Sequence, residues 1–408
     1  MNDFPTRLSL QQAQQILARL GAERRLPVER LATGRADGRV LRADVVAPSA
    51  LPAFDNSAMD GFALRHADSG EGAGSRRLAG EQFAGMAPLP ALAPGDCVRI
   101  TTGAPLPPGA DTILIKENAR EHGDVVAFDA LPAAGSFVRR AGEDVRGGDV
   151  VLPAGTVMTA ARIALASAVG VAQLDVSARP TVAVFATGDE IVEPGMPLGP
   201  GQVYNANRDL LMVRLRELGF SPVAWPTLPD DPARIERMLR DAADAFDLVL
   251  TCGGVSAGEK DHLPALLQQH GRVHFWKLRL RPGMPVLCGE LGRALVLALP
   301  GNPVSVLATF TALAMPLLAA LQGQEAAPPR WYAALTAPWS KRHDRLELLR
   351  GRLACDRRGQ LQVTPNSADA SHRLRGAADS DVLIVLEEGA REYAAGDVVE
   401  VLRYQPGP

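Results

Sequence analysis

The most regular hydrophobic pattern lies in the second half of the chain. From residue 181 onward, short apolar runs alternate with longer segments whose apolar residues recur every three or four positions. This pattern predicts strands at 181–186, 222–225, 248–251, 273–280 and 294–299, and helices at 208–218, 232–245, 262–269 and 304–321. Strands that alternate with helices of this size are typical of an α/β layer with a largely parallel sheet.

The first half of the chain has a different pattern. A helix is expected from Ser9 to Gly21, because Ser9 and Gln12 have capping-box spacing and Gly21 would end the helix. From about residue 40 to 151, short apolar runs such as 97–100, 112–115 and 150–152 alternate with Gly/Pro turns, which indicates mostly β structure. A helical pattern returns at 159–169.

These changes of pattern predict a multidomain protein of α/β plus β class. We expect a partly helical stalk from residues 1–45 and 146–179, with a mostly β domain inserted at 46–145. The α/β domain follows at 180–327, and a linker at 326–329 leads to a small closed β domain at 328–408. Apolar runs at 346–349, 382–386 and 398–402, separated by turns, predict the strands of this last domain.

Composition and charge exclude several partners and compartments. A formal net charge of −3, with acidic and basic residues mixed along the chain, is not typical of nucleic-acid binding. The N-terminal residues lack the apolar core of a signal peptide, and no uninterrupted apolar run is long enough to span a membrane. The four cysteines are scattered singly, which favours buried thiols over disulfides or a zinc site. We therefore expect a cytoplasmic protein with no membrane contact.

The loops that follow the predicted strands are candidates for a binding site. Ligands of open α/β sheets bind beyond the carboxyl ends of the strands. The five loops are 187–190, 229–231, 252–261, 281–285 and 300–305, and we expect them to meet at one edge. Glycines such as Gly253 and Gly254 would let backbone amides approach an anion, and helix N-termini beside them favour negative charge. This edge is suited to a phosphate group.

Charged residues are concentrated in the same loops. Carboxylates, which are ligands that Mg²⁺ accepts together with a substrate phosphate, occur at Glu190, Asp230, Glu259 and Asp261. A simpler interpretation also stays open, in which acidic residues such as Asp230 only cap helices.

A basic row is predicted beside them. Lys277, Arg279 and Arg281 alternate in the sequence, so an extended strand would project all three from one face, as a site for phosphate or molybdate. The alternative is that this row is a solvated strand face.

The chain has no Walker A loop, dinucleotide fingerprint or nucleophile elbow, so P-loop, NAD-dependent and serine-hydrolase chemistry are disfavoured.

Six segments together resemble one known family. The segments are DNSAMDG, TTGAPLPPGAD, RRAGEDVRGGDVVLPAGT, ATGDEI, GGVSAGEKD and LPGNPVS, in this order over nearly the whole chain. They resemble the molybdopterin molybdenumtransferases, a family that includes the C-terminal domain of gephyrin. The GGVS segment alone is less specific, because the molybdopterin adenylyltransferases share it.

The resemblance implies a fold, a reaction and a set of residues. The fold would be an elongated homodimer of four-domain chains, with a central α/β molybdopterin-binding domain and a C-terminal β-barrel. The reaction would insert molybdate into adenylylated molybdopterin and release AMP, with Mg²⁺ present. The residues implied as catalytic are Asp60, Asp144, Glu190 and Asp261, of which Glu190 and Asp261 would hold the metal. Those implied in substrate binding are Thr102, Gly253, Gly254, Ser256, Asp230, Lys277, Arg281, Arg350 and Ser371.

This chain departs from the family sequence at one loop, and the resemblance also implies partners and leaves two other functions open. Many members have Lys-Pro-Gly-Lys-Pro where this chain has Arg281-Pro-Gly-Met284-Pro, so one cation is exchanged and another is lost. Expected partners are a second copy of the chain and, transiently, a molybdopterin adenylyltransferase and molybdoenzymes or their chaperones. The alternatives are a molybdopterin adenylyltransferase and a non-catalytic scaffold of the same fold.

Overall fold

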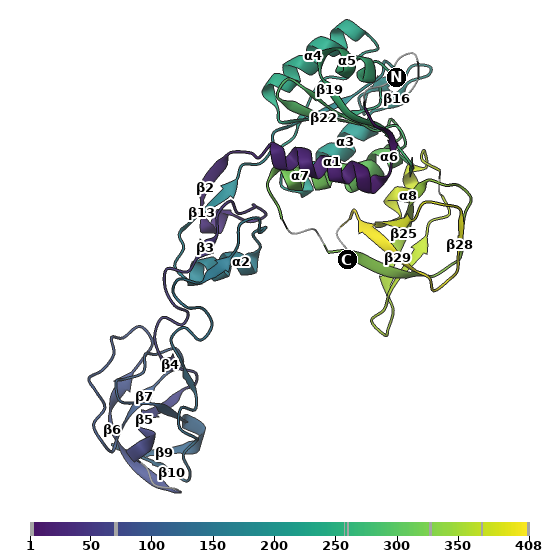
Figure 1. Ribbon diagram of the computed structural model, residues 1–408. Coiled ribbons are helices and arrows are strands. Elements are labelled where there is room, and N and C mark those ends of the chain that lie inside the picture. Colours follow the sequence, from purple (N-terminus) through teal and green to yellow (C-terminus); the bar gives the residue numbers. More distant parts are fainter. Residues whose placement is uncertain are drawn as a thin grey trace.

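The computed structural model describes residues 4–68, 72–256, 258, 261–325, 329–368 and 370–405. The molecule is elongated: a β domain lies at one end, a narrow stalk follows, and an α/β domain and a β-barrel pack together at the other end (Figure 1). The predicted multidomain α/β plus β architecture is confirmed. Residues 326–328 of the expected linker lie outside the described residues.

A seven-stranded sheet forms the centre of the α/β domain. Every pairing in it is parallel except the two made by β21, so the prediction of a largely parallel sheet is confirmed. The strands, in spatial order, are β1 (Thr6–Leu8), β19 (Arg272–Leu278), β21 (Leu287–Leu291), β22 (Ala294–Leu299), β18 (Leu248–Cys252), β14 (Val182–Ala186) and β17 (Val223–Ala224).

Helices cover both faces of this sheet. Alternate residues of a strand point to opposite faces, so Val182 and Val184 pack on one helical layer and Ala183 and Phe185 on the other. The first layer consists of α1 (Leu10–Glu23), α3 (Ala206–Glu217), α6 (Pro303–Thr309), the π turn η4 (Phe310–Ala314) and α7 (Met315–Leu321). The second consists of α4 (Pro232–Ala245) and α5 (Leu263–His270).

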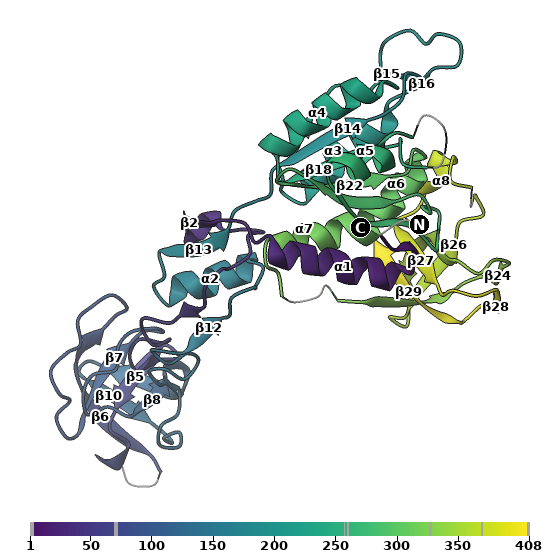
Figure 2. The ribbon, with the colours of Figure 1, turned by 45° about the horizontal axis from the view of Figure 1, so that its top comes forward.

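The N-terminal segment belongs to this domain. We expect residues 1–45 in the stalk, but β1 pairs with β19 and α1 packs beside α7, so that only the part from β2 (Val28–Ala32) onward belongs to the stalk (Figure 2). The capping box of Ser9 and Gln12 is confirmed. Gly21 does not end the helix, which continues to Glu23. It lies instead where α1 crosses α7, because only a residue without a side chain fits against Ala320.

The helix from residue 303 to 321 is the most apolar segment of the chain. By length and composition it is able to cross a membrane, but 78% of its most apolar window is buried inside the protein. It packs in the helical layer on the sheet, beside α1, with residues such as Val306, Phe310 and Leu317 fully buried. Its hydrophobicity is explained by its place in the core.

The stalk and the inserted domain are built mainly from antiparallel strands. The stalk contains β2 (Val28–Ala32) paired with β13 (Gln173–Ser177), β3 (Val45–Val46) paired with β12 (Val150–Leu152), η1 (Thr33–Arg35) and α2 (Ala160–Ala168). The inserted domain has a six-stranded sheet of β8 (Thr112–Ile115), β5 (Gly61–Leu64), β7 (Asp96–Ile100), β6 (Gly74–Gln82), β10 (Val125–Phe128) and β9 (Ala119–His122). Beside it lie the pair β4 (Asn56–Ser57) and β11 (Val138–Arg139), and the turns η2 (His66–Asp68) and η3 (Lys116–Asn118).

The C-terminal domain is a closed barrel, as predicted. Five strands close on themselves because β25 pairs with both β26 and β27: β25 (Leu346–Cys355), β26 (Leu361–Pro365), β23 (Trp331–Leu335), β29 (Val398–Arg403) and β27 (Val382–Leu386). Outside the barrel lie β24 (Trp339–Lys341) paired with β28 (Arg391–Tyr393), and α8 (Leu374–Ala378).

The prediction of one continuous strand at 273–280 is wrong, and the difference affects how two domains are joined. The expected strand 273–280 divides after Leu278, next to Lys277, whose backbone has φ of +68°, a left-handed conformation that side chains rarely adopt. Residues before the division pair within the α/β sheet as β19. Residues after it form β20 (Leu280–Arg281), which pairs with β25 of the barrel. The two domains therefore share one continuous stretch of backbone.

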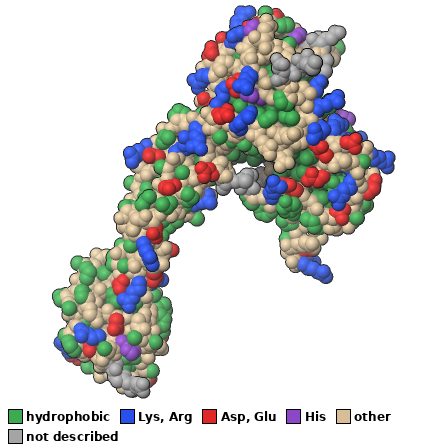
Figure 3. Space-filling model, in the orientation of Figure 1, with side chains coloured by type: hydrophobic (Ala, Val, Ile, Leu, Met, Phe, Trp, Pro, Cys, Tyr) green, Lys and Arg blue, Asp and Glu red, His purple; other side chains and the backbone are tan. Residues whose placement is uncertain are grey.

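Charges and cysteines on the molecule agree in part with expectation. Basic and acidic side chains are intermixed on the face shown in Figure 3, where the described side chains form no broad area of one sign. All four cysteines are free thiols, and Cys97, Cys252 and Cys288 are buried as expected. Cys355 differs, since it is exposed near the end of β25.

The crossing at Gly21 gives a test of the packing. A Cβ at residue 21 would lie 2.5 Å from the Cβ of Ala320. We expect Gly21→Ala to lower the free energy of unfolding by about 1–3 kcal/mol, because overpacking separates the helices. Gly34→Ala is the control, because a Cβ there meets nothing within 4 Å, and it should leave stability equal or up to about 1 kcal/mol higher. Calorimetric unfolding measures both, and an equally stable Gly21→Ala protein would contradict the close crossing.

Candidate functional site

The five loops beyond the strands of the α/β sheet meet around one cavity. Its volume is about 1060 Å³, and residues from every loop line it, as the strand order predicts. The loop contributions are Thr187, Gly188 and Glu190; Pro229 and Asp230; residues 252–256 and Asp261; residues 281–285; and residues 300–303. The barrel adds Arg345, Ala370, Ser371 and His372 to the wall. The cavity therefore lies between two domains.

Glycines allow two of these loops to pass close together at the base of the cavity. Gly253 has φ of +97°, and a Cβ there would lie 2.4 Å from the hydroxyl of Thr187. That hydroxyl donates a hydrogen bond to the carbonyl of Cys252 at 3.0 Å. Any other residue at 253 would force the loops apart, so this glycine is required by the backbone. Gly253, Gly254 and Ser256 all line the cavity, as predicted.

The predicted carboxylates also line the cavity. Glu190, Asp230 and Asp261 come from three different loops. The carboxylate of Asp261 accepts a hydrogen bond from the amide of Gly258 at 2.7 Å, and the amide of Asp230 donates to Asp189 at 3.2 Å. Glu259 lies outside the described residues. The described residues contain no group of three or more histidine, cysteine or acidic side chains arranged to hold a metal.

The helix-cap interpretation applies to one acidic residue of the second loop. Asp231 accepts hydrogen bonds from the amides of Ala233 and Arg234 at 3.0 and 3.3 Å, and so caps α4. Its neighbour Asp230 faces the cavity instead. Capping therefore explains Asp231 and leaves Asp230 in the candidate site.

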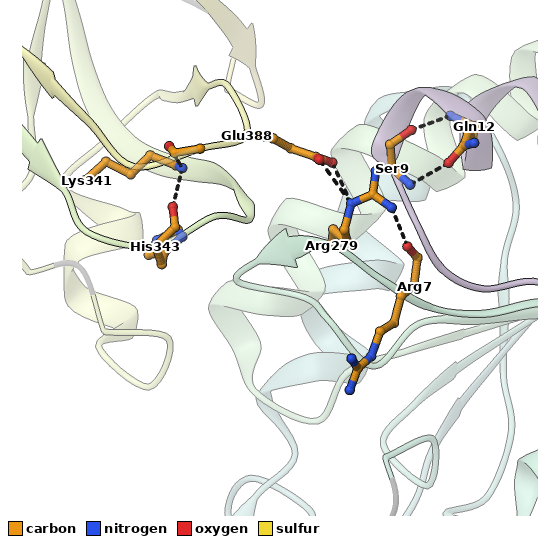
Figure 4. Close-up of polar contacts among 8 residues, drawn as sticks. Arg7, Ser9, Gln12, Arg279, Lys341, His343 and Glu388 are labelled. Atoms are coloured by element: carbon orange, nitrogen blue, oxygen red, sulfur yellow. Dashed lines mark hydrogen bonds and ion pairs between the residues drawn. The ribbon is translucent and has the colours of Figure 1, made fainter.

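The predicted basic row does not exist as a row. Because the backbone turns left-handed at Lys277 and the strand ends at Leu278, the three cations go to different places. The ammonium of Lys277 lies over the ring of Trp276, 4.2 Å from its centroid. Arg279 pairs with Glu388 of the barrel at 3.0 Å and donates to the carbonyl of Arg7 at 2.7 Å (Figure 4). Arg281 lines the cavity, and Lys277 and Arg279 are not among its lining residues.

Ser371 lies at the cavity surface, whereas Arg350 is buried behind it. Ser371 lines the cavity, and its hydroxyl accepts a hydrogen bond from the side-chain amide of Asn302 at 3.2 Å. Arg350, in contrast, is only 2% exposed and does not line the cavity. Its guanidinium donates to the carbonyls of Ala370 and Arg373, on either side of Ser371. Arg350 therefore holds the loop that carries Ser371, which differs from the expected direct contact with substrate.

The remaining predicted residues lie in the inserted domain. The carboxylate of Asp60 accepts hydrogen bonds from the amide and hydroxyl of Thr102 at 2.8 and 2.9 Å, and Lys116 lies 3.8 Å away. These contacts, the Thr102 amide first, lower the pKa of Asp60 below its ordinary value. Asp144 lies in the loop that leads back to the stalk, where its amide donates to the carbonyl of Leu51.

Within one chain, the inserted domain is separated from the cavity by the whole length of the stalk (Figures 1 and 2). The predicted site residues therefore form two groups. The first is Asp60 and Thr102, with Asp144 at the stalk side of the same domain. The second surrounds the cavity between the α/β domain and the barrel. A single chain does not bring the two groups together.

Comparison with known proteins covers all four units of the chain. Residues 8–170 match the MoeA N-terminal region (domain I and II), residues 183–320 a probable molybdopterin binding domain, and residues 332–404 the MoeA C-terminal region (domain IV). A molybdopterin molybdenumtransferase of Haemophilus influenzae is 38% identical over 90% of this chain and 91% of its own length. The chain belongs to the MoeA family.

Other relatives extend the match. A molybdopterin molybdenumtransferase of Synechococcus elongatus is 35% identical over 97% of this chain and 99% of its own length. The crystal structure of a MoeA protein from Pyrococcus horikoshii covers 98% of this chain and 100% of its own, with a TM-score of 0.79 and 27% identity. The MoeA fold therefore extends over the whole chain.

Some lining residues of this MoeA-family cavity escaped the sequence prediction. They come from β16 (Val203–Tyr204) and the start of α3, which follow β15 (Ile191–Val192). The side-chain amide of Asn207 donates to the carbonyl of Gly301 at 2.6 Å and so ties two loops together. The sequence does contain a signal for the start of this helix: Asn205 is a typical N-cap residue, and its side chain accepts a hydrogen bond from the amide of Arg208. Recognising that cap would have placed the helix start, and Asn207 with it, at the edge of the sheet.

The Asp60–Thr102 pair gives a test in this MoeA-family chain. Thr102→Val removes the hydroxyl donor and keeps the amide donor, so we expect the pKa of Asp60 to rise part of the way toward its ordinary value. Titration of the carboxyl carbon by NMR measures the change. Asp129 is the internal control, because Arg120 is what lowers its pKa. An unchanged pKa at Asp60, or an equal change at Asp129, would contradict the local hydrogen bond.

Proposed function

We propose that this protein is a molybdopterin molybdenumtransferase, which inserts molybdate into adenylylated molybdopterin and releases AMP. The observation that carries the proposal is one cavity that gathers glycine-rich loops, carboxylates and two arginines, Arg281 and Arg345, between two domains. One substrate carries phosphate groups and the other is an oxyanion, so both need amide donors and cations. Relatives that match nearly the full chain are named for this activity.

The cavity residues suggest a division of roles. The loop of Gly253, Gly254 and Ser256 would hold the phosphates of adenylylated molybdopterin, because its glycines let backbone amides approach them closely. Arg281 would bind molybdate, since a guanidinium offers paired donors to an oxyanion. Ser371 would contribute a hydroxyl on the barrel side.

A magnesium ion fits the carboxylate wall. Mg²⁺ is commonly held by one or two carboxylates together with substrate phosphates and water, so Glu190 and Asp261 suffice without a cluster of three. When bound, the ion would neutralise phosphate charge while the phosphoanhydride bond to AMP is broken. Asp230, on the same wall, would orient the substrate from its own loop.

We also propose that the protein works as a homodimer with composite sites. Asp60, Thr102 and Asp144 would face the cavity of the second subunit, since one chain keeps them apart from its own cavity. Exposed apolar side chains surround β4 and β11 of this domain, as a protein interface requires: Phe54 (48% exposed) precedes β4, Met59 (41%) precedes Asp60, and Phe137 (41%) precedes β11, which pairs with β4. A two-fold axis would create two such sites.

The proposed reaction also implies a cellular location and transient protein partners. A cytoplasmic location suits a biosynthetic enzyme of this kind. Transient contacts with a molybdopterin adenylyltransferase, which would supply the substrate, and with molybdoenzymes or their chaperones, which would receive the product, follow from the reaction itself.

Molybdate-dependent release of AMP from adenylylated molybdopterin tests the function. We expect it from the wild-type protein, and a protein that only adenylylates molybdopterin or only binds it would contradict the proposal. Arg281→Ala should raise the KM for molybdate about 10- to 150-fold, the value of a charge-assisted hydrogen bond of about 1.5–3 kcal/mol. Arg279→Ala is the control, because Arg279 pairs with Glu388 and does not line the cavity.

A hybrid dimer tests the composite site. Asp60→Asn and Asp261→Asn homodimers should each be impaired at both sites. In a mixed dimer both changes fall in one site and leave the other intact, so activity should return to about half of the wild-type value. Co-expression with two different tags and sequential purification yields the hybrid. A mixed dimer no more active than its parents would mean that each site lies within one subunit.

A further inference from the structure

The barrel places a buried carboxylate directly beside the cavity. The side chain of Glu347, in β25, is 5% exposed. One of its oxygens accepts a hydrogen bond from the indole of Trp339 at 3.4 Å and lies 3.5 Å from the imidazole of His343. The other oxygen lies 3.7 Å from Nε of Arg281. A carboxylate this deeply buried is costly unless a cation compensates it.

The backbone fixes this ion pair. Strands β20 and β25 pair in parallel, and Arg281 and Glu347 are direct partners in the register. The arginine comes from the α/β domain and the glutamate from the barrel. Arg281 is partly exposed and lines the cavity, whereas Glu347 is not among the lining residues. The carboxylate is thus placed to act on the ligand only through the guanidinium.

Other cations near Glu347 are engaged elsewhere or neutral. Burial lowers the pKa of His343, so its imidazole is neutral near pH 7. The ammonium of Lys341 donates to the carbonyls of His343 and Gly389 at 2.7 and 2.6 Å (Figure 4). Arg281 is therefore the cation whose side chain both pairs with Glu347 and reaches the cavity.

We propose that Glu347 is a positioning residue, which holds the Arg281 guanidinium in the orientation that binds the oxyanion substrate. The proposal rests on the proposed function, because it assigns a partner to the residue expected to bind molybdate. An arginine side chain has several rotatable bonds, and fixing it in advance removes an entropic cost from anion binding. The C-terminal barrel would thereby contribute to the site through a residue that does not touch the ligand.

The chain offers a matched control at the same domain boundary. Arg279 and Glu388 form a second ion pair between the α/β domain and the barrel, at 3.0 Å (Figure 4). Arg279 does not line the cavity. A glutamate-to-glutamine change at 388 therefore removes an interdomain ion pair without altering Arg281. Any effect that comes only from loosening the domains should be the same for both changes.

The experiment compares Glu347→Gln and Glu388→Gln in the full-length protein. Glutamine keeps the shape of the side chain and an acceptor for Trp339, and removes the charge. We expect Glu347→Gln to raise the KM for molybdate roughly tenfold, at the lower end of what outer partners of binding groups contribute, with kcat within about twofold. The affinity for molybdate alone, measured by calorimetry, should fall by a similar factor. Glu388→Gln should change neither.

Two further variants separate positioning from stability. Glu347→Asp keeps the charge and should restore part of the affinity, and it also serves if the glutamine variant does not fold. In an Arg281→Ala background, Glu347→Gln should cause no further loss, because the two residues act as a unit.

Unchanged or tighter molybdate binding by Glu347→Gln would overturn the proposal, and tighter binding would mean that Glu347 competes with the anion. An equal loss for Glu347→Gln and Glu388→Gln would overturn it as well. A wild-type protein that binds no molybdate would overturn this proposal together with the proposed function. An active wild type with an unaffected Glu347→Gln variant would overturn this proposal alone.

Discussion

The division of one strand after Leu278 determines how the two domains around the cavity are joined. Up to Leu278 the chain hydrogen-bonds within the α/β sheet, and from Leu280 it hydrogen-bonds with the barrel. The left-handed backbone at Lys277 accompanies this change of partner. Because a continuous backbone belongs to both sheets, the barrel cannot move without moving the loop that carries Arg281. This stretch of backbone thereby links the α/β domain to the barrel beside the cavity that both domains line.

The stalk imposes the opposite constraint on the inserted domain. Its two antiparallel pairs lead the chain away from the cavity and back, with a small core around Leu41, Leu174 and Val176. This core stabilises a spacer and brings no inserted-domain residue to the cavity of the same chain. The hydrogen-bonded pair of Asp60 and Thr102, with the exposed Met59 beside it, is the part of the inserted domain that supports the proposed contact with a second subunit.

The sequence predicted the elements and the edge of the sheet better than the directions of side chains. Hydrophobic periodicity located most strands and helices of the α/β domain, and strand order alone implied that the five loops meet. The strand β21 was missed because its short run, residues 287–291, precedes a tight turn at Gly292. The basic row failed because a period of two holds only while the strand stays extended, and Lys277 breaks it. The resemblance implies that Arg350 contacts substrate, but sequence does not reveal depth: the side chain is 2% exposed, and its guanidinium donates to the carbonyls of Ala370 and Arg373.

The ion pair between Arg281 and Glu347 matters more in this chain because a cation is missing from the loop of Arg281. Where related sequences carry Lys-Pro-Gly-Lys-Pro, this chain has methionine at 284, a partly exposed apolar side chain on the cavity wall. With the second charge absent, Arg281 is the cation that this loop contributes to the cavity, and Arg345 contributes another from the barrel. A guanidinium binds through directed, paired donors and loses much of its advantage when its orientation varies. The buried carboxylate of Glu347 restricts that orientation, so a loop with one cation gains more from it than a loop with two.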